Sequence, residues 1–393
     1  MDNVADLAQK LFTPEGLENP YPIYRAFRES APVVWVPFHQ GEGGRFVITS
    51  YPYGDAVLKD ARVFKDGSKL GWVDENPINR SMLFQDPPSH TRLRGLVNRA
   101  FTPAMVARLG PRIQEIVEEL ADDLAGLSSV DFMTALAQPL PVIVIAEILG
   151  VPSEDRPRFR EWSRLTVGDG DTTPEESTAA GVAMAQYFDH LIRDKRRNPS
   201  DDLISALLHL EDAGDRLSHE ELLGMCVLLL VAGHETTINL LGNGLYAILR
   251  HREQWDRLHD EPELVDTAVE EMLRYDAPVQ EATFRFAGER LELAGVAIES
   301  GTMVNVMLGA ANRDPDQFPE PDRFDVGRTP NRHLSFGRGI HVCLGAPVAR
   351  LEAQLAFTHL VNRFPRLDVA DTPTWRPNAM FRGLQHLLVT TGA

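Results

Sequence analysis

Two short runs of β-branched and aromatic residues near the start of the chain predict a β-hairpin. They occupy positions 32–37 and 45–50, with glycines between them. Glycine-containing loops between two such runs are typical of hairpins. A helical pattern follows over about 53–62, and we expect residues 21–60 to form a β-rich N-terminal part.

The longest apolar segment predicts a buried helix. Ser218 and Glu221 have the spacing of a capping box, in which each side chain binds the other residue's backbone N–H. Apolar residues dominate from there to about 249, and no proline interrupts them. A helix of about 30 residues is roughly 45 Å long. Because it is apolar on nearly all sides, it should be buried.

The remaining patterns are mainly helical. Helical periodicity fills about 86–277, short strands follow near 291–298 and 302–307, and a last helix is expected over 346–364. The predicted fold class is therefore mainly α with small β-sheets. No Ser/Gly linker, low-complexity run or internal repeat divides the chain. The chain is longer than a typical domain of about 100–200 residues. We nevertheless expect residues 1–393 to form one large domain with the long helix at its centre.

Charge narrows the functional classes. The net charge of −18 argues against a nucleic-acid or membrane-surface binder, which would present a basic face. The N-terminus lacks the basic and then apolar pattern of a signal peptide. The uncharged apolar run 222–233 is shorter than the about 20 residues that cross a bilayer. We expect a cytoplasmic protein, and since nothing demands an oligomer, a monomer.

Two cysteines occur, and they have different surroundings. Cys226 lies in an apolar helical context and is expected to be a core residue. Cys343 closes a glycine-rich segment and precedes a helix that begins near Ala346, whose N-terminal dipole favours an anionic sulfur. Glycines at 337, 339 and 345 allow unusual backbone dihedrals and close approach to a flat ligand. A lone cysteine is more often a buried structural residue. A functional role for Cys343 therefore depends on the spacing of the whole glycine-rich segment.

Polar residues interrupt the middle of the long helix. Glu235 and Thr236 follow Ala232 and Gly233, and a buried acid and hydroxyl are costly unless they are satisfied or used. The Thr236 hydroxyl can bind the carbonyl of Ala232 or Gly233, which bends a helix. Gly233 would leave room for a small ligand such as dioxygen. Alone, such a pair is more often structural.

Two further pairs have helical spacing. His90 and Arg94 are four residues apart and point the same way, which suits a carboxylate. Glu271 and Arg274 are three residues apart on one face. Such pairs are common on exposed helices and carry little weight by themselves.

The segment from Phe336 to Gly345 resembles the haem-binding loop of the cytochrome P450 family. The family pattern is Phe-Gly-x-Gly-x-His-x-Cys-x-Gly, and this chain matches it at every specified position. The other motifs follow in the family's order between Asp86 and Glu352, so the resemblance covers essentially the whole chain. It implies haem b with Cys343 as the axial thiolate to the iron, and a long helix that crosses over the haem.

The resemblance also implies roles for the other motifs. Thr236 would hydrogen-bond activated dioxygen, the co-substrate, and Glu235 would relay protons through water. Glu271, Arg274 and Arg323 would form a structural cluster. His90, Arg94, Arg285 and His341 would bind the haem propionates. The full set of expected haem contacts is His90, Arg94, Ala232, Gly233, Arg285, Phe336, Gly337, Gly339, His341, Cys343 and Gly345.

The implied activity is insertion of one oxygen atom into a hydrophobic small molecule, most simply as a hydroxylation. The expected substrate pocket is apolar and comprises Leu70, Trp72, Leu83, Phe84, Val231, Val279, Ala282, Met380 and Phe381. No flavin or nicotinamide motif occurs, so electrons must come from a separate ferredoxin or flavodoxin with its NAD(P)H-dependent reductase. The arginine-rich surface around Arg92 and Arg99, extended by Arg338 and Arg350, is a candidate docking face.

Three other functions fit parts of the pattern. A peroxide-driven peroxygenase of the same fold would not need the Glu235–Thr236 pair. A non-catalytic haem-binding protein, such as a gas sensor, would need a partner domain or a transduction surface. A cysteine-dependent hydrolase would need a base and an oxyanion site near Cys343, and His341 is two residues away. Within the family, epoxidation, demethylation and coupling fit the motifs as well as hydroxylation does.

Overall fold

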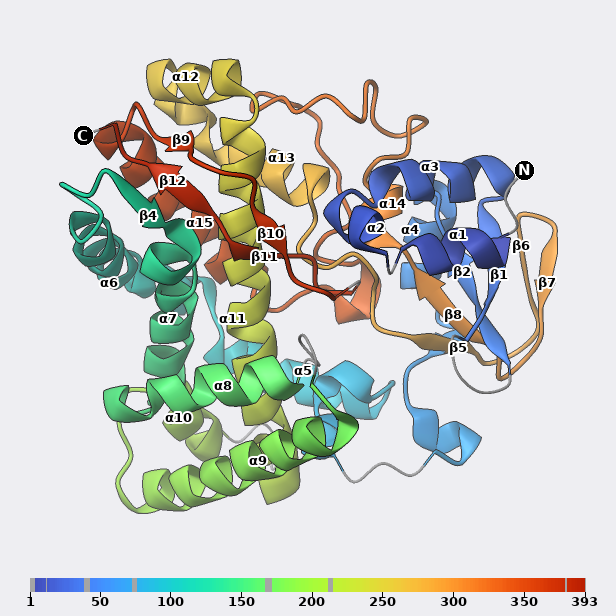
Figure 1. Cartoon of the computed structure of the whole chain (residues 1–393). Helices are drawn as coiled ribbons and strands as arrows, with labels where there is room; N and C mark the ends of the chain where they lie inside the picture. The colour runs from blue at the N-terminus through green and yellow to red at the C-terminus, as the bar shows by residue number, and fades with distance from the viewer. Residues whose placement is uncertain are drawn as a thin grey trace.

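The computed structural model describes residues 4–11, 13–38, 43–72, 76–166, 172–210, 215–378 and 380–392. Most of these residues are helical, and the chain ends lie on opposite sides of the molecule (Figure 1). The helices are α1 (Val4–Lys10), α2 (Pro14–Glu18), α3 (Tyr21–Ser30), α4 (Tyr51–Lys59), α5 (Ser89–Ala100), α6 (Pro103–Asp122), α7 (Pro139–Leu149), α8 (Arg156–Thr166), α9 (Pro174–Arg197), α10 (Leu203–His209), α11 (His219–Leu249), α12 (Arg252–Asp260), α13 (Val265–Tyr275), α14 (Leu308–Ala311) and α15 (Ala346–Arg363).

The predicted long helix is α11, which crosses the middle of the molecule (Figure 1). It has 31 residues, and its predicted capping box is present: Ser218 Oγ accepts from Glu221 N at 3.2 Å, and Glu221 Oε2 accepts from Ser218 N at 2.8 Å. By length and composition α11 could cross a membrane, but 67% of its most apolar window is buried inside the protein. It is therefore placed as a core helix.

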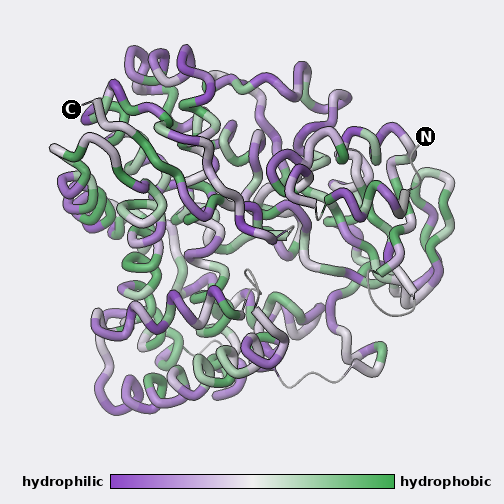
Figure 2. The backbone as a smooth tube through the Cα atoms, viewed as in Figure 1, coloured by the Kyte–Doolittle hydropathy of each residue, from purple (hydrophilic) through white to green (hydrophobic). Residues whose placement is uncertain are grey.

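Several helices cover α11 and share its core. α7, α9, α12, α13 and α15 all contact it. α7 is largely hydrophobic along its length, whereas α12 at the edge of the molecule is largely hydrophilic (Figure 2). Because both α7 and α11 are apolar on nearly every side, each is packed by protein on most faces.

The strands form small sheets beside the helical part. A five-stranded sheet has the order β1-β2-β8-β5-β3, in which β2 and β8 are parallel and the other neighbours are antiparallel. β12 lies between β4 and β9 in a second sheet, and β6–β7 and β10–β11 are two-stranded. The strands are β1 (Val33–Pro37), β2 (Gly44–Ile48), β3 (Val63–Phe64), β4 (Ser129–Asp131), β5 (Arg285–Ala287), β6 (Leu291–Leu293), β7 (Val296–Ile298), β8 (Met303–Val306), β9 (Asp368–Val369), β10 (Thr374–Trp375), β11 (Leu384–His386) and β12 (Leu388–Thr390).

The predicted fold class, mainly α with small sheets, is confirmed. The β1–β2 hairpin is also confirmed, but the description of 21–60 as β-rich is wrong, because helices α3 and α4 occupy its two ends. Tyr24 and Phe27, three residues apart, are both buried, which gives α3 the apolar stripe of a surface helix. Helices occupy most of the described residues of 86–277, and β4 interrupts them to pair with β12 at the far end of the chain.

Candidate active site

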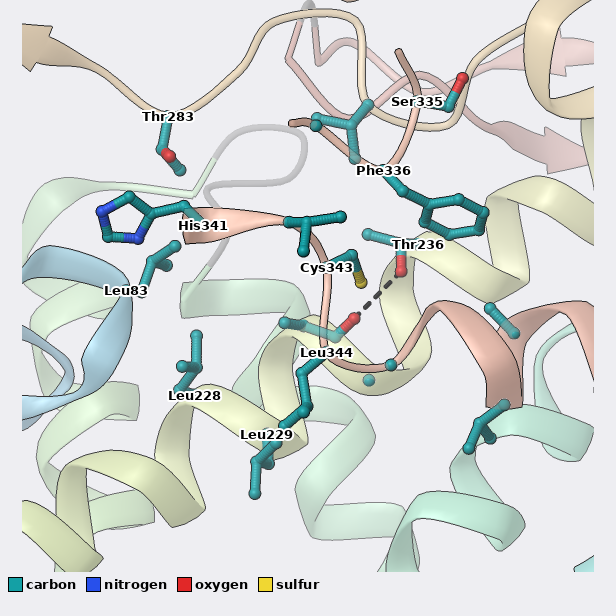
Figure 3. Close-up of a pocket in the computed structure, with 18 of the residues that line it drawn as sticks. Leu83, Leu228, Leu229, Thr236, Thr283, Ser335, Phe336, His341, Cys343 and Leu344 are labelled. Atoms are coloured by element: carbon teal, nitrogen blue, oxygen red, sulfur yellow. Dashed lines mark hydrogen bonds between the residues drawn. The ribbon is translucent and has the colours of Figure 1, made fainter. Parts of the chain in front are cut away.

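A central cavity lies beside the middle of α11. Its wall comes from α5, α7, α11, α15, the segment 278–285 and the loop 335–345 (Figure 3). Most of the lining is aliphatic, as in sites for small apolar molecules. Examples from these elements are Val144, Leu228, Ala232, Leu240, Val279 and Val348.

The cysteine loop forms one wall of this cavity. Gly337 and Gly339 have φ values of +69° and +72°, a region that favours glycine. A Cβ on Gly339 would also lie 2.5 Å from the carbonyl oxygen of Leu58. Gly345 differs from the prediction, since its φ of −79° is ordinary. It lines the cavity, so its small size rather than its dihedral matters there.

Cys343 presents its thiol to the cavity (Figure 3). Burial raises the pKa of the thiol, while the backbone N–H groups of Gly345 and Ala346 and the charges of Arg94 and Arg350 act in the opposite direction. These groups stabilise the thiolate, which is the form that binds a metal ion. Cys226, by contrast, is fully buried in α11, as predicted for a core residue.

The four predicted propionate ligands line this same cavity. The rings of His90 and His341 lie with centroids 4.3 Å apart. Arg94 Nη1 donates to the carbonyl of Val342 at 2.9 Å, and Arg285 Nη1 donates to that of Thr283 at 2.8 Å. α5 brings His90 and Arg94 to one face, as their spacing predicted.

His90 and Arg285 are buried, Arg94 and His341 are partly buried, and the group is incompletely paired. Within the described part of the chain, neither ring nitrogen of His90 has a hydrogen-bond partner, nor has Nε2 of His341. Burial, followed by the charges of Lys65 and His90, lowers the pKa of His341 to about 2, and burial lowers that of Arg285 to about 10. Buried donors without partners are costly. The wall therefore fits a ligand with carboxylates, and the thiol of Cys343 fits its metal ion.

Glu235 and Thr236 are adjacent on α11, but their side chains have different surroundings. Thr236 lines the cavity, and its hydroxyl donates to the carbonyl of Ala232 at 3.0 Å, shown as the dashed line in Figure 3. Glu235 does not line the cavity. Its Oε2 accepts from Arg376 Nη1 at 2.8 Å, and its Oε1 lies 3.7 Å from His234 Nε2. Sequence reasoning missed Arg376, because the pairing joins α11 to the loop after β10.

Gly233 has a packing role as well as a place in the cavity wall. A Cβ there would lie 2.9 Å from Cδ1 of Ile145 on α7. The glycine thus lets α7 and α11 approach closely, a contact that the sequence did not predict.

The predicted structural cluster is only partly correct. Glu271 and Arg274 form a bidentate ion pair of 2.7 and 2.8 Å, and both side chains are fully buried. Arg323 contributes only its carbonyl oxygen, and its side chain is 58% exposed. The second arginine on Glu271 is Arg328, with Nε 3.1 Å from Oε1. The chain reverses between Arg323 and Arg328 through tight turns around Asp325, so the later side chain points inward.

Some of the residues predicted for the substrate pocket line the cavity, and others lie outside it. Leu83, Val279 and Ala282 line the cavity, whereas Leu70 and Trp72 are 39% and 50% exposed. These last two are wrong, because the loop folds outward and Trp72 packs on Phe284 and Phe286 instead. Phe84, Val231, Met380 and Phe381 are likewise not part of the cavity wall, and residues 73–75 of this loop lie outside the described residues.

Sequence reasoning missed the contribution of α7 and most of that of α11. Both helices are apolar on nearly every side, so periodicity could not show which face meets the cavity. The missed lining residues on these helices include Val144, Ile148, Leu228, Leu229 and Leu240.

The His341 ring does not serve the cysteine as a base. It packs against His90 and points away from the Cys343 sulfur in Figure 3. His341 therefore does not supply the base that a cysteine-dependent hydrolase needs at its sulfur.

A thiol, a wall of buried carboxylate-binding groups and an apolar chamber under a central helix define a haem-thiolate protein. The chain belongs to the cytochrome P450 family, whose model, described as Cytochrome P450, matches residues 169–384. It is 45% identical over 378 residues to cytochrome P450 monooxygenase PikC of Streptomyces venezuelae, covering 94% of this chain and 90% of that protein.

Two further comparisons, one with a sequence and one with a solved structure, support membership of the same family. The chain is 40% identical to 6-deoxyerythronolide B hydroxylase of Saccharopolyspora erythraea, over 94% of this chain and 95% of that protein. The structure of cytochrome P450 PksS from the Bacillus subtilis bacillaene polyketide synthase superposes with a TM-score of 0.91 at 40% identity, over the whole of both chains.

The cofactor and reaction class follow from family membership. The protein uses haem b, with Cys343 as the axial thiolate, and dioxygen. It is a monooxygenase that takes electrons from redox partners and inserts one oxygen atom into a hydrophobic small molecule.

Proposed function

We propose that this monooxygenase hydroxylates an apolar substrate held between α11 and the segment 278–285, with Thr236 as the polar residue nearest the reaction. The proposal is carried by one juxtaposition: the Cys343 thiol, the Thr236 hydroxyl and an aliphatic wall share one cavity. Haem bound through a thiolate supplies the activation of dioxygen. The chain supplies position, protons and the exclusion of water.

Thr236 is proposed to hold a proton donor at its Oγ1. Because its hydroxyl hydrogen is given to Ala232, the oxygen lone pairs are available to accept from water in the cavity. Glu235 is the proposed proton source, but Arg376 holds its carboxylate on another side of the helix. Delivery to Thr236 therefore requires the Glu235 side chain to turn or water to bridge the two.

Replacing Thr236 by alanine is expected to uncouple electron use from product formation. The substitution leaves the apolar wall intact and removes one hydroxyl, so substrate binding should change little. We expect product per NAD(P)H consumed to fall by about tenfold or more, toward the range typical of a lost proton-transfer group. Thr236→Ser should retain most of the coupling, whereas an equal loss in both variants would contradict a role for the hydroxyl.

An optical titration of the ferric protein tests the proposed substrate class. Fatty acids, terpenoids, steroids, macrolides and small aromatics are added while the Soret band is followed. A shift toward high spin by members of an apolar class is expected, since the cavity wall is largely aliphatic. A matched series with added hydroxyl groups should bind more weakly. If only polar compounds shift the band, the substrate class is wrong.

The electron donor is proposed to be a ferredoxin or flavodoxin with a separate reductase. The docking face that we suggested from the sequence needs one correction, which concerns arginines that are already paired. Arg92 forms ion pairs with Glu221 on α11, and Arg350 pairs with Glu270 at 2.6 Å, so their charges are already partly balanced. Arg99 is exposed on α5 and stays a candidate in that stretch. We also propose that the protein is a cytoplasmic monomer with one domain over 1–393.

A further inference from the structure

One buried cation in the cavity wall is used neither by the predicted haem contacts nor by the proposed reaction. Lys65 lies between β3 and the short 3₁₀ turn Gly67–Leu70, and it is 2% exposed. Its backbone N–H donates to Asp86 Oδ1 at 3.0 Å, which fixes the start of the side chain. The side chain then extends into the cavity that holds Cys343.

The positive charge of the Lys65 ammonium is not neutralised by a carboxylate among the described residues. Nζ donates to Thr283 Oγ1 at 2.7 Å and lies 5.5 Å from the centre of the Phe84 ring. Among the described residues, no carboxylate is within ion-pair distance of it. An ammonium has three N–H donors, and one neutral hydroxyl does not compensate a buried charge. Burial, and then the charge of Arg285, lowers the pKa of Lys65 well below its usual value.

The nearest acid is already occupied. The Asp86 carboxylate accepts from the backbone N–H groups of Lys65 and Asp66, and from Nζ of Lys69 at 2.7 Å. Lys69 is half-exposed and lies outside the cavity wall. Asp86 therefore neutralises the outer lysine, and the inner lysine faces the cavity.

We propose that Lys65 binds a haem carboxylate and is a further anchor of the cofactor. Its charge acts on His90 and His341, and the charge of Arg285 acts on it, so it belongs to the same basic wall. Thr283, which accepts from Lys65, also gives its carbonyl to Arg285. Lys65 and Arg285 thus reach the cavity side by side, and a carboxylate between them would use donors that are otherwise incompletely paired. The inference rests on haem binding and not on the substrate.

Transfer of haem from the holoenzyme to excess apomyoglobin tests this role without any turnover. Lys65→Met keeps the length of the side chain and removes the charge, and circular dichroism checks that the variant folds. We expect haem loss to be about tenfold faster, as for a lost hydrogen bond to a charged group. Lys65→Arg should stay near the parent rate. Lys69→Met, the same charge change in the same loop, should leave the rate unchanged.

Haem dimethyl ester, which lacks the carboxylates, separates the possible ligands. In protein reconstituted with it, the parent and Lys65→Met should lose the cofactor at equal rates. A difference that persists there, or no difference with ordinary haem, would overturn the proposal. If instead Lys65→Met weakens only the Soret shift caused by tetradecanoic acid, and not by its methyl ester, the lysine binds a substrate carboxylate. A parent protein without a haem band would refute the assigned cofactor itself.

Discussion

Cys343→Ser protein is expected to lose the red-shifted Soret band of the ferrous carbonyl complex and to lose monooxygenase activity by orders of magnitude. An alcohol oxygen is a weaker electron donor than a thiolate, and the thiolate's electron push favours cleavage of the O–O bond. The amides of Gly345 and Ala346 and the nearby Arg94 would still face the altered side chain, so the loss would report the sulfur itself. The carbonyl difference spectrum and product formation check it.

Cys226→Ser is the matched control for this experiment. Cys226 is fully buried in α11, so a serine there should lower the free energy of unfolding by about 1–3 kcal/mol through an unpaired hydroxyl. It should leave the thiolate spectrum unchanged. A normal carbonyl spectrum in Cys343→Ser, or its loss in Cys226→Ser, would refute the assignment of the ligand.

Glu271→Gln is expected to lower the free energy of unfolding by about 3–5 kcal/mol. The Arg274 guanidinium is fully buried and would keep its charge without the carboxylate that now binds it at 2.7 and 2.8 Å. That loss is a large share of a typical stability of about 5–15 kcal/mol. The midpoint of urea denaturation, followed with haem absorbance and circular dichroism, measures it.

Two arginines provide the internal comparison. Arg328→Ala should also destabilise the protein, because its side chain is 11% exposed and its Nε contacts Glu271. Arg323→Ala should change the free energy of unfolding by less than about 0.5 kcal/mol, since its side chain is 58% exposed and only its carbonyl binds Arg274. Equal effects of the two substitutions would contradict the geometry of the cluster.

The features that were predicted correctly depend on residues close together in sequence. The capping box of Ser218 and Glu221 needs only one helical turn, and the pairing of Glu271 with Arg274 needs less than one. The positive φ of Gly337 and Gly339 follows from the chemistry of the residue itself. Cys343 was identifiable because its loop is a contiguous pattern.

The features that were missed join distant segments. Arg376 reaches Glu235 across 141 positions, and Lys65 meets Thr283 across 218. No local pattern distinguishes a buried lysine from a surface one in a short loop. Trp72 is a large apolar residue of the kind that lines pockets, but its loop folds outward and its ring packs on Phe284.

The sequence by itself determined the class of this protein, its thiolate ligand and its long central helix, because each is specified by side chains within a few turns of one another. Tertiary structure alone decided which faces of α7 and α11 meet the cavity, and that Thr236 lines it while Glu235 pairs with Arg376. It also decided that Lys65 joins the predicted basic side chains in the cavity wall. Those choices depend on how separate elements pack, and an all-apolar helix or an isolated lysine carries no mark of its eventual neighbours.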